Sequence, residues 1–495
     1  MLQVESWSAK SLRSIISCAA GDSSHDGGTC QVEYLERHLG AQGLGATWIV
    51  IERDYRDRYF IDEYTAYYAL CQAPYPAVCT RLHFFAGEGS LEDFDGLLED
   101  ALRDRSFQKL EGELDERYLG FVVVRPIPSV PIGRTVLRTL RNTPAVTRCF
   151  PGLRDYTVHL AGLRFTVRGV AFQQQDQAVG ACATTAMWSA LQVALPRDGM
   201  RPPTPAALTV AANRHLLTGG RPFPAALGLN TEQMCEALRT SGADPVVFTR
   251  GADTDPEVLE QLILISLKSG LPVILAIQNG LAGHAVTAVG YRAAGPAHLN
   301  LQGRRQTFRH GQIERLYIQD DRLGPYARAT TPKVQGELGL EIPFRYQGGM
   351  VNPETSVIRH VIVPQYPKLR ATARDLIRAS SALYPLFEEQ ARNQGQDLEV
   401  DARFARSGEI LQELRSCTVR PDRFAHFLSE VRLSRYVGVL KLYLGGRDCL
   451  TVLLDATDMF RKGPLGQQVL GFVATDPTLH ALADGLGKAA HRPVG

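Results

Sequence analysis

The stretch QQQDQAVGACATTAMWSALQVAL, from Gln173 to Leu195, joins a glutamine-rich segment to a sequence with helical periodicity. After Cys182 the small and apolar residues form one helical stripe at Ala183, Ala186, Met187, Ala190, Leu191, Ala194 and Leu195. We therefore predict a helix whose first turn carries Cys182. A helix N-terminus favours a thiolate and can stabilise an oxyanion, because it carries partial positive charge and unpaired N–H groups. The competing interpretation is a small buried hydrophobic side chain, which is the commoner role of cysteine.

Two other positions offer partners for a reactive thiol. His284 begins HAVTAVGY, a predicted strand that follows the apolar strand Leu271–Ile277, so its side chain can reach a cleft. The run RLYIQDDRLGPYA predicts another strand, on which Ile318 and Asp320 share one face and Asp321 lies on the other. A carboxylate at this strand end can fix the tautomer of a histidine. Only one of these two carboxylates can face the histidine strand, and that one is expected to accept the Nδ1 hydrogen of His284.

The order of these motifs resembles that of the papain-like cysteine peptidases, and most of all the bacterial branch that includes the double-glycine leader peptidases. GLNTEQMCEALRTSGA (228–243) resembles the second helix of that branch, and LISLKSGLPVILAI (264–277) resembles the helix and strand that lead to its histidine. The resemblance covers residues 165–365. It implies an α+β fold in which the helix that carries the nucleophile packs on an antiparallel sheet.

The resemblance also implies roles for single residues. Cys182 matches the nucleophile, His284 the general base and Asp320 the residue that orients the histidine. Gln177 matches the glutamine whose side-chain amide helps to form the oxyanion hole.

The match is less complete next to the nucleophile. Ala183 stands where the branch commonly has a glycine, and Gln175 offers an alternative to Gln177 at a different spacing. The oxyanion-hole glutamine therefore has two candidates.

Length suggests that other domains flank this region. A chain of 495 residues is too long for one core and suggests about three domains. We predict an N-terminal α/β accessory domain over 1–164, a papain-like catalytic domain over 165–365 and a C-terminal α/β accessory domain over 366–495. Flanking domains of this size suggest that a regulatory protein partner or autoinhibition governs access to the site.

Composition limits the class of protein. The formal charge of +2 and the lack of a long basic run argue against a nucleic-acid partner. The nine cysteines include no C-x-x-C pair, which argues against a disulfide framework and a structural zinc site. Residues before Cys18 lack the apolar core of a leader, and no run of about 18 apolar residues occurs. We therefore expect a cytoplasmic protein without a membrane partner.

Other polar clusters favour structural roles. SSHDGGTC (23–30) is interpreted as a flexible loop rather than a metal site of His25, Asp26 and Cys30. ERDYRDRYFIDEY (52–64) favours a paired-charge surface or a buried ion network over a catalytic carboxylate pair among Asp54, Asp57, Asp62 and Glu63. GLGK (485–488) lacks residues that a P-loop needs, so we expect no nucleotide there. The proline-rich segment Pro196–Leu227 is expected to run over the surface near the cleft.

Together these residues predict a thiol hydrolase. The expected activity is that of an intracellular cysteine peptidase, which cleaves a protein or peptide with Cys182, His284 and Asp320 and uses no cofactor or metal. One alternative hypothesis is an acyltransferase or glutamine deamidase with the same triad. The other is a non-catalytic binding or scaffold protein on the same fold.

Overall fold

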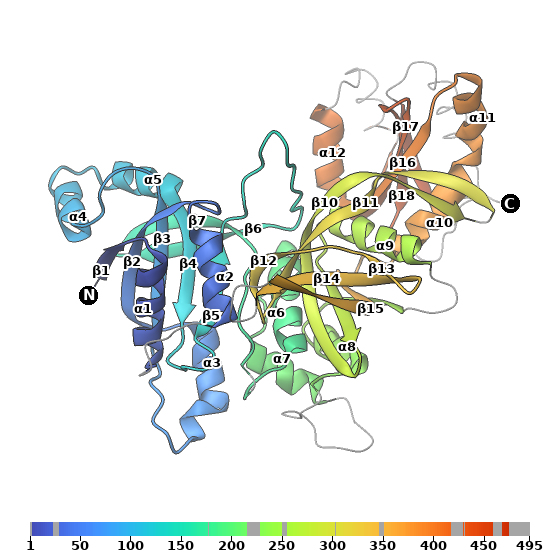
Figure 1. Ribbon diagram of the computed structural model, residues 1–495. Coiled ribbons are helices and arrows are strands. Elements are labelled where there is room, and N and C mark those ends of the chain that lie inside the picture. Colours follow the sequence, from blue (N-terminus) through green and yellow to red (C-terminus); the bar gives the residue numbers. More distant parts are fainter. Residues whose placement is uncertain are drawn as a thin grey trace.

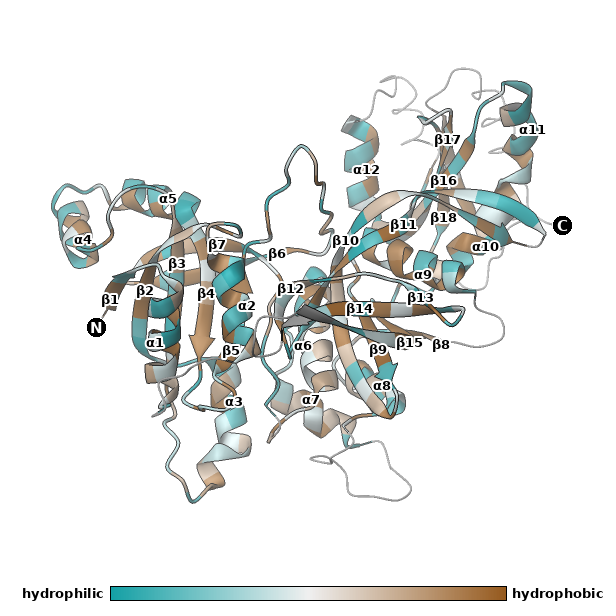
Figure 2. Cartoon of the chain, viewed as in Figure 1, coloured by the Kyte–Doolittle hydropathy of each residue, from teal (hydrophilic) through white to brown (hydrophobic). Residues whose placement is uncertain are grey.

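The computed structural model describes residues 2–22, 29–176, 178–214, 228–249, 255–301, 303–345, 351–416, 429, 431–458 and 468–474. Within these ranges the fold is α+β and is built from helices and mainly antiparallel sheets (Figure 1). Figure 2 shows apolar residues concentrated on the central strands, with polar residues gathered on outer helices such as α4, α5 and α12. No described helix combines the length and apolar character needed to span a membrane.

The N-terminal sheet has five strands in sequential order: β1 (Leu2–Ser6), β2 (Ala46–Tyr55), β3 (Cys79–Ala86), β4 (Tyr118–Val124) and β5 (Ile132–Leu137). Every residue of β4 is buried, because both faces of the sheet are covered. One face packs against α1 (Ala9–Ala20) and α2 (Cys30–Leu39). The α/β description predicted for this part is wrong in its strict sense, since all of its strand pairs are antiparallel.

The opposite face of this sheet packs against the hairpin of β6 (Arg154–Leu160) and β7 (Leu163–Gly169). Exposed and buried residues alternate along both strands, as expected for a hairpin with one face in the core. Ala161 and Gly162 form its tight turn with φ values of 49° and 83°. The helical segments of this region are α3 (Arg58–Ala66), η1 (Tyr68–Leu70), α4 (Phe94–Arg103) and α5 (Phe107–Arg117).

The central sheet contains β8 (Asp244–Thr249), β9 (Val273–Asn279), β10 (Ala282–Leu301), β11 (Arg304–Asp320), β12 (Gly324–Ala329), β13 (Lys333–Val334), β14 (Glu337–Arg345) and β15 (Val351–Gln365). Its main path runs β13-β14-β15-β9-β10-β11, while β8 pairs with β15 and β12 pairs with β11. Because β10 and β11 are antiparallel, the beginning of β10 lies beside the end of β11.

Helices cover both faces of the central sheet. The first face packs against α6 (Cys182–Ala194) and α8 (Thr231–Thr240), with α7 (Pro205–Ala212) packed on these two helices, and the other face packs against α9 (Pro256–Lys268). A short helical turn, η2 (Pro196–Asp198), follows α6. Strand alternation explains the division: Ile274 and Ala285 belong to the core around α6, whereas Leu275 and Val286 belong to the core around α9.

Helix α6 also contacts the N-terminal part of the chain. All residues from Ala183 to Ala194 are buried. The rings of Trp188 and Tyr59 meet edge to face at 5.2 Å, and Gln192 Nε2 donates a hydrogen bond of 3.0 Å to the Tyr59 hydroxyl. The apolar sequence of α6 is therefore explained by burial between the N-terminal part and the central sheet.

The C-terminal strands extend the central sheet. These are β16 (Leu398–Arg406), β17 (Tyr436–Leu444), β18 (Arg447–Asp455) and β19 (Val469–Ala474), with α10 (Ala373–Leu383), α11 (Pro385–Asn393) and α12 (Ser407–Ser416) beside them. β16 joins β11 by one parallel pairing, and the other strand pairs are antiparallel, so the predicted α/β description is again wrong in its strict sense. The sequence Gly-Gly-Arg-Asp at 445–448, between two apolar runs, predicts a hairpin at this point. This prediction is confirmed, because Gly445 and Gly446 form the β17–β18 turn with φ values of 53° and 78°.

Candidate active site

Cys182 is the first residue of α6, as the helical periodicity predicts. The preceding N-cap residue, Ala181, has extended backbone and offers no side-chain acceptor to the helix. Thr184 Oγ1 accepts a hydrogen bond of 3.1 Å from the Ala181 N–H, and the Thr185 hydroxyl donates one of 2.8 Å to the Cys182 carbonyl. These bonds hold the first turn, while the N–H of Cys182 has no acceptor within the helix because of its position. The positive end of α6 therefore faces the half-buried thiol.

His284 is the third residue of β10, near the beginning of that strand as predicted. Its backbone pairs with Ile277 on β9, and its side chain is 10% exposed. Three residues farther along β10, the Thr287 hydroxyl donates a hydrogen bond of 2.7 Å to the Ala186 carbonyl of α6. This bond ties the start of β10 to α6, and the Cys182 side chain lies close enough to His284 to raise the pKa of the histidine.

Asp320 is the last residue of β11 and is fully buried. Its Oδ1 lies 2.9 Å from Nε2 of His284 and also accepts the backbone N–H of Arg322 at 3.0 Å. The structure thus brings together Cys182, His284 and Asp320 from three elements that are far apart in the sequence.

The histidine uses its two nitrogens in the opposite way from our expectation. We predicted that Nδ1 would bind Asp320, but Nε2 of His284 makes that bond. Nε2 lies at the far end of the ring from the β10 backbone, where the carboxylate at the end of β11 reaches it. Nδ1, the nitrogen nearer the backbone, takes no part in that bond.

The carboxylate of Asp320 controls the charge of the histidine. Burial by itself would lower the pKa of His284, but the negative charge and hydrogen bond of Asp320, with the hydrogen bond to Cys182, raise it to about 10. Burial opposes ionisation of Asp320 as well, yet His284 and Arg322 hold the pKa of Asp320 below its usual value. At neutral pH the pair is therefore an imidazolium and a carboxylate.

A second carboxylate, that of Asp321, also approaches the histidine ring. Its Oδ1 lies 3.7 Å from Nε2 of His284. We predicted that strand alternation would turn Asp321 away, but β11 ends at Asp320, so the next residue no longer follows the alternation. Burial, together with the neighbouring charge of Asp320, raises the pKa of Asp321 to about 7. Asp320 remains the carboxylate within hydrogen-bond distance of the ring.

These same three groups could also hold a metal ion. One ligand atom from each of His284, Asp320 and Asp321 lies within 4.8 Å of the others. A metal bound there would replace the hydrogen bond between His284 and Asp320, because both would use Nε2 and the same carboxylate. The donor set is therefore compatible with a metal in principle, and our expectation that the site uses none stays a prediction.

The glutamines before Cys182 are not equivalent. Gln177 lies outside the residues that the structure describes. Gln175 lines the cleft beside Cys182, and its Nε2 donates a long hydrogen bond of 3.5 Å to the Gly180 carbonyl. Gln173 and Gln174 are buried and contact the N-terminal part of the chain. Among the described glutamines of this run, Gln175 is thus the one next to the thiol.

Cys182 and His284 line an open cleft of about 1260 Å³. Its walls come from α8, β8, β9, the beginning of β10 and β15. Charged side chains of both signs line it: Glu232, Glu236, Arg239, Arg322, Glu354 and Arg359. Sequence reasoning missed these residues, because they come from α8, β15 and the turn after β11, which no local motif joins.

The other cysteines differ from Cys182 in their surroundings. None of the described cysteines forms a disulfide, and Cys18 and Cys30 are exposed. Burial raises the pKa of the thiols of Cys79 and Cys235. Exposed Cys30 is therefore a suitable comparison when the reactivity of Cys182 is measured.

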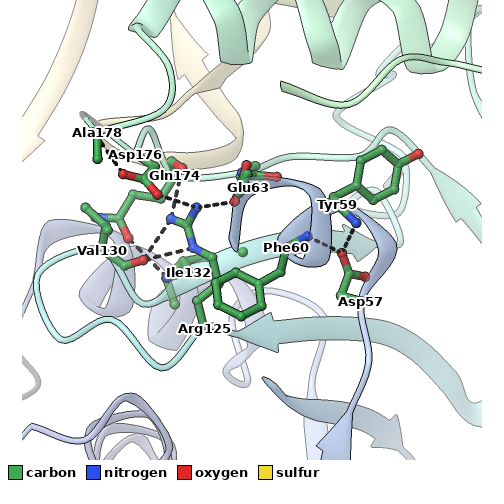
Figure 3. Close-up of polar contacts among 12 residues, drawn as sticks. Asp57, Tyr59, Phe60, Glu63, Arg125, Val130, Ile132, Gln174, Asp176 and Ala178 are labelled. Atoms are coloured by element: carbon green, nitrogen blue, oxygen red, sulfur yellow. Dashed lines mark hydrogen bonds and ion pairs between the residues drawn. The ribbon is translucent and has the colours of Figure 1, made fainter. Parts of the chain in front are cut away.

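The remaining predicted clusters have structural roles where they are described. His25 and Asp26 lie outside the described residues. In the stretch 52–64, Asp57 accepts the N–H groups of Tyr59 and Phe60 at the start of α3 and pairs with Arg134. Glu63 pairs with Arg125 at 3.3 Å in the buried network of Figure 3. The predicted buried ion network is thus confirmed for part of this stretch.

The segment after α6 is not a surface loop throughout. We expected Pro196–Leu227 to run over the surface, but Leu208 and Ala212 of α7 are fully buried, and α7 packs against α6 and α8. The alanine-rich sequence of α7 permits this close packing. The part of the segment from 215 to 227 lies beyond the described ranges.

No protein-family model matches the chain, and a search of curated proteins finds no significant match.

Proposed function

We propose that the protein is a thiol hydrolase, and specifically a cysteine peptidase with Cys182 as nucleophile, His284 as general acid and base, and Asp320 as the orienting carboxylate. The observation that carries the proposal is the grouping of Cys182 with the His284–Asp320 pair at the wall of one open cleft. A buried cysteine with a purely structural role needs neither a charged histidine nor access to a cleft.

The arrangement of elements supports a papain-like core. The proposed nucleophile begins a buried helix, which packs on antiparallel strands. The proposed base begins β10, and the proposed orienting acid ends β11, the next strand of the sheet. This order agrees with the resemblance drawn from the sequence.

In the proposed resting state the proton of the Cys182 thiol lies on Nδ1 of His284. The thiolate attacks the carbonyl carbon of the substrate and forms a carbon–sulfur bond. The carbon–nitrogen bond then breaks as the leaving amine takes the proton from His284. In the second half of the catalytic cycle, His284 takes a proton from water, and the resulting hydroxide attacks the thioester. The carbon–sulfur bond then breaks, which releases the carboxylic acid and Cys182.

Asp320 keeps His284 suited to this cycle. The carboxylate holds Nε2 and favours the imidazolium, which donates the proton to the leaving amine. The backbone N–H of Cys182, at the end of α6, is one proposed donor to the oxyanion. A glutamine side chain is the other, with Gln175 in the cleft and Gln177 as the candidate from the family resemblance.

The cleft supports a peptide or protein substrate. Its volume of about 1260 Å³ exceeds the 300–1000 Å³ that is common for small-molecule pockets. Its polar lining suits a backbone with many donors and acceptors. As part of the proposal, the enzyme works in the reducing cytoplasm, where the nucleophile stays a thiol.

The test combines covalent labelling with product analysis. A peptide vinyl sulfone should label wild-type protein at Cys182, as located by peptide mass spectrometry. Labelling should be lost in Cys182→Ala and strongly reduced in His284→Gln, whereas the control Cys30→Ala should label normally. Exclusive labelling of another cysteine would refute the assignment.

A peptide library then separates hydrolysis from the alternatives. New carboxyl termini support a peptidase, while amine adducts or deamidated glutamine support acyl transfer or deamidation. If the protein shows no labelling and no turnover, that result would support the non-catalytic alternative.

A further inference from the structure

The segment Gln173–Asp176, which leads to the nucleophile, has no helix or strand of its own. Gln173, Gln174 and Asp176 are nevertheless 5% exposed or less. Buried backbone groups outside regular structure need partners from elsewhere in the protein. The partners of this segment show what holds it in place.

The edge of the N-terminal sheet supplies the first partners. The Gln174 N–H donates to the Ile132 carbonyl at 3.0 Å, and the Ile132 N–H donates to the Gln174 side-chain oxygen at 3.1 Å. Two residues before Gln174, Phe172 exchanges two backbone hydrogen bonds with Thr135. The segment is thus attached to β5, an element remote from the nucleophile helix in the sequence.

Arg125, which follows β4, supplies the central contact (Figure 3). Its side chain is 1% exposed. Nη2 donates to the carbonyl of Gln174 at 3.2 Å and to that of Val130 at 2.7 Å. Nη1 lies 3.3 Å from the carboxylate of Glu63 and 4.0 Å from that of Asp176. One guanidinium therefore joins α3, the loop before β5 and the segment before Cys182.

Asp176 connects Arg125 to the residues just before α6. Its Oδ1 accepts the Ala178 N–H at 3.0 Å, and its carbonyl accepts the N–H groups of Val179 and Gly180. The Tyr68 hydroxyl donates to the other carboxylate oxygen at 2.6 Å. The resulting turn leads directly to Ala181, the N-cap of α6.

We propose that Arg125 is a positioning residue for the active site: it fixes the segment that presents the oxyanion-hole glutamine and the start of α6. The inference rests on the proposed function, because it assigns a role in the same reaction. It makes the N-terminal part a structural component of the catalytic site, although the sequence indicated an accessory domain. The physical basis is the planar guanidinium, which donates in several fixed directions, as the point charge of a lysine does not.

The test compares two reactions of Cys182. Acylation by p-nitrophenyl acetate forms an oxyanion, whereas alkylation by iodoacetamide displaces iodide at a saturated carbon and forms none. Misplacement of oxyanion donors should therefore slow acylation alone. We expect Arg125→Met to lower the acylation rate by about 10- to 100-fold, with the alkylation rate changed less than about threefold.

Arg81→Met is the matched control. Arg81 is also buried, and its guanidinium pairs with one carboxylate, Glu52, and one backbone carbonyl, that of His159. Neither of these partners belongs to the segment before Cys182. We expect this variant to keep the wild-type ratio of acylation to alkylation, even where its melting temperature falls as much as that of Arg125→Met.

Arg125→Lys keeps the measurement possible if Arg125→Met does not fold. It retains the charge without the fork, so we expect an intermediate fall in the ratio and faster amide hydrogen exchange at 174–180. The inference is overturned if folded Arg125 variants keep the wild-type ratio and exchange, or if Arg81→Met changes them equally. Wild-type protein that is acylated no faster than Cys182→Ala would instead refute the proposed function, and amide exchange would still decide whether Arg125 holds the segment.

Discussion

Replacing Asp320 with asparagine should lower the pKa of His284. In the wild-type protein burial lowers this pKa, and it reaches about 10 because the charge and hydrogen bond of Asp320, with smaller contributions from Cys182 and Asp321, together outweigh the burial. Asparagine has nearly the same shape and can accept a hydrogen bond, but it carries no charge. The substitution therefore removes the dominant favourable interaction of the imidazolium and leaves the cost of burial in place.

The size of the effect follows from the separation of the charges. The closest atoms of the pair are 2.9 Å apart, so the charge centres are about 4 Å apart. At an effective dielectric constant of about 20, their attraction is about 4 kcal/mol. One pKa unit corresponds to about 1.36 kcal/mol, so full loss of this charge lowers the pKa by about three.

Asp321 should compensate for part of this loss. The charge of Asp320 helps to hold the pKa of Asp321 at about 7, so its removal makes Asp321 ionise more easily. Asp321 then supplies a negative charge near His284, whose Nε2 lies 3.7 Å from its Oδ1. We therefore expect the pKa of His284 to fall by about one to three in Asp320→Asn. In the double variant Asp320→Asn/Asp321→Asn we expect the full loss of about three.

The direct assay is a histidine NMR titration from pH 5 to 11 on isotope-labelled protein, with the His284 resonance assigned from His284→Gln. The pKa of His284 should be highest in wild type, lower in Asp320→Asn and lowest in the double variant. Titration midpoints of His284 that agree within about 0.3 among all three proteins would refute the electrostatic reasoning.

The raised pKa of His284 also predicts how the stability of the protein changes with pH. The native pKa of His284 is raised above its unperturbed value of 6.5, so its ion pair stabilises the fold fully below pH 6.5. This contribution is lost as the pH rises towards about 10. Urea unfolding should accordingly show the advantage of wild type over Asp320→Asn shrinking between these two pH values, and an advantage that grows would contradict the assignment.

Three further substitutions test the site. Cys182→Ala should abolish turnover of the best library peptide and leave the melting temperature within a few degrees, while exposed Cys30→Ala keeps full activity; retained turnover in Cys182→Ala would exclude the nucleophile. Asp321→Asn should change turnover at pH 7 by less than about threefold, because Asp320 makes the direct hydrogen bond, and a loss above about 100-fold would assign the orienting role to Asp321. Thr287→Val should lower the free energy of unfolding by about 1–3 kcal/mol in urea titrations, because the buried Ala186 carbonyl loses its donor; an unchanged value would show that the bond contributes nothing.

Local patterns in the sequence were sufficient for several features of the fold. The helical stripe predicted that α6 begins at Cys182, and the strand pattern placed His284 near the start of β10. The paired glycines predicted the β17–β18 turn. These predictions succeeded because each depends on neighbouring residues alone: periodicity decides which residues of an element are buried, and glycine permits positive φ.

The tertiary structure decided how these elements meet. Which nitrogen of His284 binds Asp320 depends on where the end of β11 lies beside β10. The approach of Asp321 depends on the residue at which β11 ends, and the proposed role of Arg125 depends on an N-terminal sheet packed beside α6. Periodicity assigns a side chain to a face of its own element, but contact between side chains of separate elements is set by register, strand ends and packing, which arise only when the whole chain has folded.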